Sequence, residues 1–128
     1  MLPRQFRAAT SVLASSVRQL HATPLAARPS LLEGAARDSA LQDLGSRGWS
    51  HDETRDAVTK TFEFSSFVDA FGFMAKAALH AEKMNHHPEL FNVYSRVEVT
   101  LTTHDCDGLS SNDTELALIM DDLASSSG

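Results

Sequence analysis

The spacing of apolar residues in the second half of the chain predicts three β-strands. Apolar and polar residues alternate over 57–64 and 96–103, and a shorter apolar run covers 91–94. In the 96–103 stretch, valine and leucine line one face while glutamate and threonine line the other, so this strand has a buried side and a solvent side. Lys60 shares the apolar face of the first stretch, which predicts a strand near a sheet edge. A tight turn is expected at Ser95 and Arg96.

Apolar residues spaced three and four apart predict three helices. Asp38 or Ser39 is expected to cap a short helix that ends near Gly45 to Gly48. A long helix is expected from Ser65 or Ser66 to about Lys83, and a last helix capped by Ser110 or Ser111. The stripe of the long helix that is expected to lie on the sheet consists of Phe67, Phe71, Met74, Ala78 and Ala81. Phe73 and Ala77 widen this stripe, so part of the helix is expected to face another subunit.

The order of these elements predicts an α+β two-layer sandwich with helices on one side of the sheet. A length of 128 residues suits one small domain, expected over residues 32–124. The one cysteine, Cys106, excludes an intramolecular disulfide and fits a reducing compartment. The longest apolar stretch, 67–81, carries charged residues and is too short to cross a bilayer, so no membrane span is expected.

The N-terminal segment differs in composition from the rest of the chain. Before Glu33 it contains four arginines, several serines and threonines and no acidic residue. This composition is typical of a mitochondrial or plastid transit peptide over residues 1–31, and the alternative is a disordered basic tail. Removing the four arginines changes the formal charge from −6 to −10. A domain that acidic argues against direct binding to nucleic acid, because phosphate contacts need clustered lysine or arginine.

Three imidazoles and two carboxylates cluster at the ends of the predicted elements. Glu82 lies in the last turn of the long helix, His86 and His87 follow it, His104 follows a strand, and Asp113 lies in the first turn of the last helix. Histidine titrates near neutrality, so such a group can exchange protons at physiological pH.

Two other interpretations of this cluster stay open. The His-His-Pro tripeptide is also a natural helix stop, and Asp113 is a natural helix-start carboxylate. A zinc site could use His86, His87, His104 and Cys106. The spacing lacks the usual Cys-x-x-Cys or His-x-x-x-His pattern, so a metal is the less favoured case. No other cofactor is expected either, because the imidazoles can exchange protons unaided.

The motifs that carry this chemistry also resemble those of a known family. The stretches that carry the resemblance are Phe71-Gly72-Phe73-Met74, Glu82-Lys83-Met84-Asn85-His86-His87-Pro88-Glu89, Phe91-Asn92-Val93-Tyr94, Leu101-Thr102-Thr103-His104-Asp105-Cys106 and Asp113. The resemblance is to the pterin-4a-carbinolamine dehydratases, and it covers roughly residues 41–123. It implies a four-stranded antiparallel sheet covered on one face by helices. It also implies dehydration of a 4a-hydroxytetrahydropterin to the quinonoid dihydropterin, as in pterin cofactor recycling.

By position in the resembling motifs, each candidate residue receives an expected role. His86 and His104 would be the acid/base pair, His87 would hold the pterin, and Glu82 and Asp113 would tune or orient the imidazoles. Trp49 would line the site. Relatives commonly carry tryptophan where this chain has Leu90, and loss of that flat wall is expected to weaken pterin stacking.

The resemblance leaves two classes of function. The first is a dehydratase, expected in the mitochondrion or alternatively the plastid, that forms a homodimer or homotetramer. The second is an oligomeric binding module that uses a helical face to stabilise another protein, as the members that act as dimerisation cofactors of homeodomain transcription factors do. The complete set of candidate site residues favours the enzyme.

Overall fold

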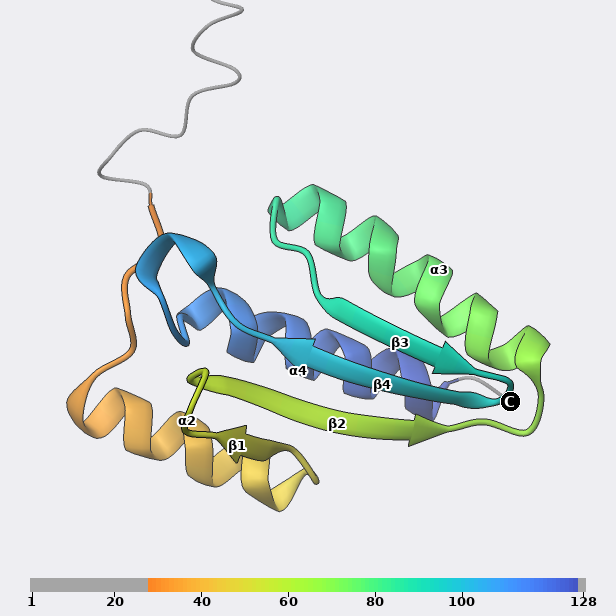
Figure 1. Cartoon of the computed structure of the whole chain (residues 1–128), viewed down its shortest axis with the longest axis horizontal. Helices are drawn as coiled ribbons and strands as arrows, with labels where there is room; N and C mark the ends of the chain where they lie inside the picture. Colours follow the sequence, from red (N-terminus) through yellow and green to blue (C-terminus); the bar gives the residue numbers. More distant parts are fainter. Residues whose placement is uncertain (1–27, 127–128) are drawn as a thin grey trace, which may run out of the picture.

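The computed structural model describes residues 28–126 and shows one antiparallel four-stranded sheet with three α-helices packed against one face (Figure 1). The α+β two-layer fold expected from the sequence is therefore confirmed. The elements in chain order are α2 (Gly34–Ser46), β1 (Ser50–Asp52), β2 (Ala57–Glu63), α3 (Phe67–Met84), β3 (Glu89–Val93), β4 (Arg96–Leu101), a 3₁₀ turn (His104–Cys106) and α4 (Ser111–Ser125). Within residues 28–126, no helix is both long and apolar enough to span a membrane.

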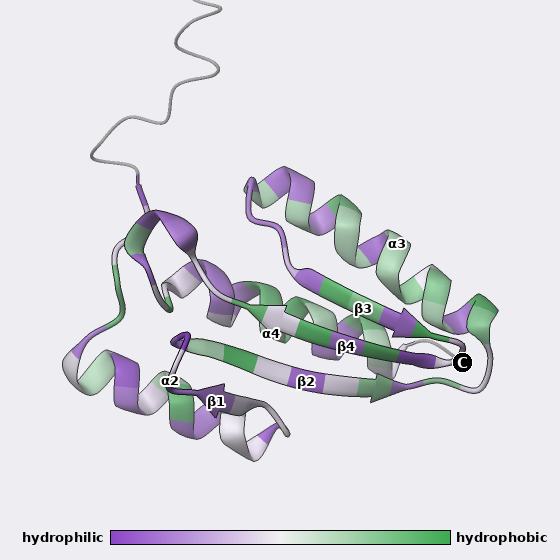
Figure 2. Ribbon diagram, viewed as in Figure 1, coloured by the Kyte–Doolittle hydropathy of each residue, from purple (hydrophilic) through white to green (hydrophobic). Residues whose placement is uncertain are grey.

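The strands lie in the order β1-β2-β4-β3, so the two longest apolar alternations form the centre of the sheet. Strands β2 and β4 pair with Val58 opposite Leu101 and Phe62 opposite Val97. Figure 2 shows hydrophobic and hydrophilic residues alternating along β4. All three strands expected from the sequence are present. The β3–β4 turn comes one residue earlier than expected, since Tyr94 adopts the left-handed conformation (φ 54°).

Strand β1 was not expected from the alternation of residues. It is three residues long, and none of Ser50, His51 and Asp52 is apolar. Its position follows from pairing with β2, where Ser50 lies opposite Thr59. A strand this short and polar carries no periodic signal.

The helix boundaries are partly as expected. The hydroxyl of Ser66 accepts a hydrogen bond from Asp69 N at 3.1 Å and caps α3. Ser110 caps α4 with a reciprocal capping box that includes Asp113. The expected start of the first helix at Asp38 or Ser39 is wrong: α2 begins at Gly34 after Glu33, which makes no side-chain cap bond, so the start carries no capping signal.

The apolar stripe expected to lie on the sheet is largely wrong. The residues of α3 that are buried are Ala70, Phe73, Ala77 and Ala81. Phe67 and Phe71 instead have 53% and 58% of their surface exposed. Both stripes have helical spacing, so spacing alone could not show which one is buried. Phe73 and Ala77 therefore lie in the core and do not face another subunit.

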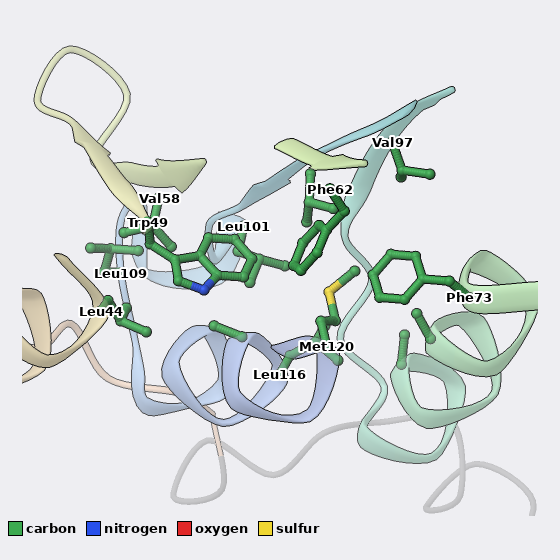
Figure 3. Packing of buried hydrophobic residues seen from close by; sticks show 14 of the residues in the cluster. Leu44, Trp49, Val58, Phe62, Phe73, Val97, Leu101, Leu109, Leu116 and Met120 are labelled. Carbon is green, nitrogen blue, oxygen red and sulfur yellow. The ribbon is translucent and has the colours of Figure 1, made fainter. Parts of the chain in front are cut away.

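Aromatic rings from three segments fill the core between the sheet and the helices (Figure 3). Phe73 packs on Phe62 with ring centroids 4.9 Å apart, and Trp49 meets Phe62 edge-on at 5.9 Å. Lys60 shares this apolar side because its ammonium donates to Asp121 Oδ1 at 2.6 Å and lies 4.8 Å from the Phe62 ring centroid. Strand β1 pairs only with Ala57 to Thr59 of β2, so from Lys60 onward β2 has no partner on that side among the described residues, as expected for a strand near a sheet edge.

Candidate active site

The ends of α3 and β4 meet at one end of the sheet, where the chain leaves both elements (Figure 1). A pocket of about 520 Å³ opens there. Its lining includes His86, His87, Glu89 and His104. Pro29 and Asn112 complete part of the wall, so the segment just before α2 and the first turn of α4 contribute to the same pocket. The fold thus brings His104 to the same pocket as the adjacent His86 and His87.

A single left-handed residue gives the two adjacent histidines different environments. Helix α3 ends at Asn85, which has φ 51° and ψ 42°, and His86 N then bonds back to Ala81 O at 3.0 Å. His86 is 8% exposed, whereas the side chain of His87 is 65% exposed. The His-His-Pro segment is therefore both a helix stop and the element that places the two imidazoles.

His86 is held by a fully buried carboxylate. Its Nε2 lies 2.6 Å from Asp113 Oδ1. The other oxygen, Asp113 Oδ2, accepts from Thr103 Oγ1 at 2.6 Å and from Ser110 N at 2.9 Å. A carboxylate only accepts hydrogen bonds, so Nε2 of His86 is the donor and Nδ1 is left to take up or release a proton.

Nδ1 of His86 makes no hydrogen bond within residues 28–126. Every fully buried side-chain nitrogen or oxygen in that range has a partner, so Nδ1 is not sealed from solvent. Since His86 lines the pocket, we infer that Nδ1 is the nitrogen that a ligand can reach.

His104 occupies a different kind of position. It is exposed at the start of the 3₁₀ turn, and its imidazole makes no hydrogen bond to any described residue. The backbone of the loop is closed behind it, since Thr103 N donates to Gly108 O at 2.9 Å and Gly108 N donates to Thr103 O at 3.2 Å. His104 also lines a second pocket of about 330 Å³ with Arg55 and Asp56. The imidazole thus borders two cavities.

Glu89 lines the histidine pocket, whereas Glu82, expected in the site, borders a separate pocket between α3 and β3. Glu82 Oε1 lies 2.9 Å from Nε2 of His87, and both side chains are mostly exposed. Arg55 pairs with Glu89 through both guanidinium nitrogens and holds the pKa of that carboxyl below its usual value, with a smaller contribution from nearby His104. Glu89 was not identified as a site residue from the sequence. Its only signal was its position directly after Pro88 in the histidine segment.

Trp49 and Leu90 lie outside this pocket. Trp49 is 4% exposed in the core, and its indole N–H donates to Asp121 Oδ2 at 3.1 Å. Leu90 borders a separate, mainly apolar pocket of about 400 Å³ between α3 and β3, together with Leu79, His87 and Pro88. Within one chain, the structure therefore does not bring Trp49 to the three histidines. Leu90 shares with His87 the lining of the apolar pocket, not that of the histidine pocket.

The described residues do not form an obvious metal centre. Across residues 28–126, no three histidine, cysteine, aspartate or glutamate side chains converge in a way that could hold an ion. Cys106 donates to Thr103 O and Gly108 O within its own loop. Its pKa is raised by burial and further by the charge of Asp113, which disfavours the thiolate form.

Comparison with known proteins gives a consistent result. Residues 30–123 match the family model described as "Pterin 4 alpha carbinolamine dehydratase". A protein of Rhizobium leguminosarum bv. trifolii, provisionally named a pterin-4-alpha-carbinolamine dehydratase, is 54% identical over 97 residues, which cover 76% of this chain and 94% of that protein. A similarly named protein of Rhizobium johnstonii is 53% identical over 93 residues, covering 73% and 90% of the two chains.

Two solved structures share the fold. The crystal structure of a transcriptional coactivator/pterin dehydratase from Brucella melitensis has a TM-score of 0.67 and 46% sequence identity, and covers 73% of this chain and 97% of that one. A pterin dehydratase-like protein described as a RuBisCO assembly factor in the alpha-carboxysome has a TM-score of 0.55 and 25% identity, with coverage of 62% and 93%.

Proposed function

Because this chain belongs to the pterin-4a-carbinolamine dehydratase family and is a hydro-lyase of that class, we propose that His86 and His104 catalyse the dehydration as an acid/base pair. The observation that carries this proposal is that both imidazoles line one pocket, and that one of them is anchored by the buried Asp113. The substrate would be a 4a-hydroxytetrahydropterin and the products water and the quinonoid dihydropterin.

The reaction requires two proton transfers that balance each other. One imidazolium donates a proton to the 4a-hydroxyl, which leaves as water when the carbon–oxygen bond breaks. A proton is removed from a ring nitrogen, and the electron pair of that N–H bond forms the new carbon–nitrogen double bond. Two histidines with opposite protonation states can perform both steps.

The surroundings of the two histidines suggest how the roles divide. Asp113 stabilises a positive charge on His86, so we assign to Nδ1 of His86 the uptake of the ring-nitrogen proton. We assign to the exposed His104 the delivery of a proton to the leaving oxygen. The pair returns to its starting state when the proton passes from His86 to His104 through solvent. His87 would hold the pterin, with Glu82 orienting its ring.

The test compares the rate of 4a-hydroxytetrahydropterin dehydration by the full chain with the rates of His86→Ala and His104→Ala and with the uncatalysed reaction. The control is His80→Ala, because His80 is exposed on α3 away from the pocket. The proposal expects both site variants to lose about 10²- to 10⁴-fold in kcat while staying folded, and His80→Ala to keep its rate. A folded His104→Ala variant with an unchanged rate would overturn the assignment.

The cellular setting is a further part of the proposal. We propose that the enzyme serves pterin cofactor recycling in the mitochondrion, with the plastid as the alternative, because residues 1–31 are rich in arginine and serine and contain no acid. Residues 1–27 lie outside the described part of the chain. Fusing residues 1–31 to a fluorescent protein tests this, and diffuse fluorescence throughout the cell would contradict it.

Residues before the expected domain boundary at residue 32 already contact the folded domain. Pro29 lines the pocket, and Leu32 N donates to Leu109 O at 2.8 Å. A domain that begins at Arg28 should therefore be more active than one that begins at Leu32, because only the first keeps this wall of the pocket.

A second candidate function is supported by the exposed face of α3. This face carries Phe67, Val68, Phe71 and Leu79, whose exposed fractions lie between 53% and 76%. Apolar residues gathered on one exposed face mark an interaction surface. We propose that it supports a homodimer or homotetramer, or a protein partner as in a binding module. Sedimentation of Phe71→Asp against the parent chain tests this, and an unchanged mass would count against it.

A further inference from the structure

Asp56 lies at the end of the β1–β2 turn and collects contacts from several elements. It adopts the left-handed conformation (φ 49°), and its side chain is 20% exposed. Both guanidinium nitrogens of Arg37 donate to its carboxylate, and His51 Nε2 lies 2.8 Å from Oδ1. The Arg37 guanidinium, with His51, holds the pKa of this carboxyl well below its usual value, so the charge is retained at neutral pH.

Asp56 also holds both ends of the loop that carries His104. Its Oδ2 accepts from Leu109 N at 3.1 Å, and its backbone oxygen accepts from Thr102 Oγ1 at 3.0 Å. Residues 102 and 109 are therefore fixed to one residue of the β1–β2 turn, and His104 lies between them. The contact is close, because a side chain at Gly108 would collide with the Asp56 carboxylate and with Leu31.

His86 and His104 are thus supported by different carboxylates. Asp113 contacts His86 directly and also binds Thr103 and Ser110 in the same loop. Asp56 touches neither imidazole but lines the second pocket beside His104. Its charge is neutralised by Arg37 from α2, so it can stay partly buried and ionised next to the loop.

We propose that Asp56, held by Arg37, is a positioning residue that fixes the loop of His104 for proton transfer. This inference rests on the proposed role of His104 in dehydration. Neither α2 nor β1 lines the histidine pocket. The proposal nevertheless gives residues on that side of the fold a measurable effect on catalysis. The effect should fall on kcat more than on KM, because His104 is the proposed proton donor, whereas His87 is proposed to hold the pterin.

The experiment measures kcat and KM of the full chain for Asp56→Ala, alone and combined with His104→Ala. Asp56→Ala is expected to lower kcat about 10- to 100-fold and to change KM less than about threefold. In the His104→Ala background the same substitution should change the residual rate less than about twofold, because the residue through which it acts is gone. Asp43→Ala removes an exposed carboxylate of α2 whose partner among the described residues is Arg47, and it is the matched control.

A second variant covers the case in which Asp56→Ala does not fold. Arg37→Met keeps an aliphatic chain on α2 but removes the guanidinium that holds the carboxylate, and it should lower kcat in the same His104-dependent way. The inference is overturned if folded variants keep kcat, or if the loss is equally large without His104. An active His104→Ala variant would refute the proposed function and this inference together, whereas an inactive His104→Ala with a fully active Asp56→Ala refutes the inference alone.

Discussion

Replacing Asp113 with asparagine tests the arrangement around His86 most directly. The carboxylate is fully buried and accepts three hydrogen bonds, one at Oδ1 from His86 and two at Oδ2 from Thr103 and Ser110. Asparagine has the same shape but only one oxygen. That oxygen is expected to stay with Thr103 and Ser110, where both partners donate, so the amide NH₂ will face His86.

The consequence for His86 is a change of tautomer. An amide NH₂ donates, so Nε2 must accept and the proton moves to Nδ1. The imidazole then offers no lone pair to the pocket, and the charge that stabilises the imidazolium is also lost. Reversed tautomers of this kind cost about 10³- to 10⁴-fold in kcat, or roughly 4 to 5.5 kcal/mol of transition-state stabilisation.

The assay is stopped-flow dehydration of 4a-hydroxytetrahydropterin, with urea unfolding to confirm that the variant is folded. Stability should fall by only about 1–3 kcal/mol, because a charged acceptor is lost from two bonds that remain made. The control is Asp122→Asn, which changes an exposed carboxylate of the same helix. A folded Asp113→Asn enzyme with more than about a tenth of the parent kcat would refute the reasoning on the tautomer.

Three other outcomes are expected. Phe73→Ala should destabilise the fold by about 3–5 kcal/mol in urea unfolding, whereas Phe71→Ala should cost less than about 1 kcal/mol in the monomer, and similar losses would contradict the assignment of the buried stripe. At pH values above the ordinary carboxyl pKa of about 3.9, Asp56→Asn should lower the free energy of unfolding by about 1–3 kcal/mol. Because the folded pKa is lowered, this difference should shrink as pH falls below that value, and a pH-independent difference would be inconsistent with it. Glu82→Gln should change kcat less than about threefold, since its pair with His87 is exposed, and a larger loss measured in the same kinetic assay would give Glu82 a direct role.

The sequence predicted most of the elements but not which helix face is buried. The alternation over β2 and β4 and the hydroxyl caps at Ser66 and Ser110 are local signals, and each was confirmed. The two stripes of α3 both have helical spacing, so local spacing cannot choose between Phe71 and Phe73. Which stripe is buried depends on the elements that pack against α3, which is a tertiary property.

The candidate site shows the same division between local and tertiary information. The residue types around His86 indicated proton chemistry, but chain order could not establish that His104 borders the same pocket. Asp113 had two interpretations, as a helix-start carboxylate and as an orienting group. Both interpretations hold at once, because one oxygen of the Asp113 carboxylate caps α4 and the other holds His86. Trp49, expected in the site, is buried in the core instead.

The double attachment of Asp113 affects how relatives of this chain can be interpreted. A descendant that gave up dehydration in favour of an assembly role would still need this carboxylate to start α4, so selection for folding alone would preserve it. His86 is tied to the same buried carboxylate, whereas the exposed His104 carries no comparable structural duty and would be free to drift. The survival of the aspartate is therefore weak grounds for inferring an active enzyme, and His104 is the informative position.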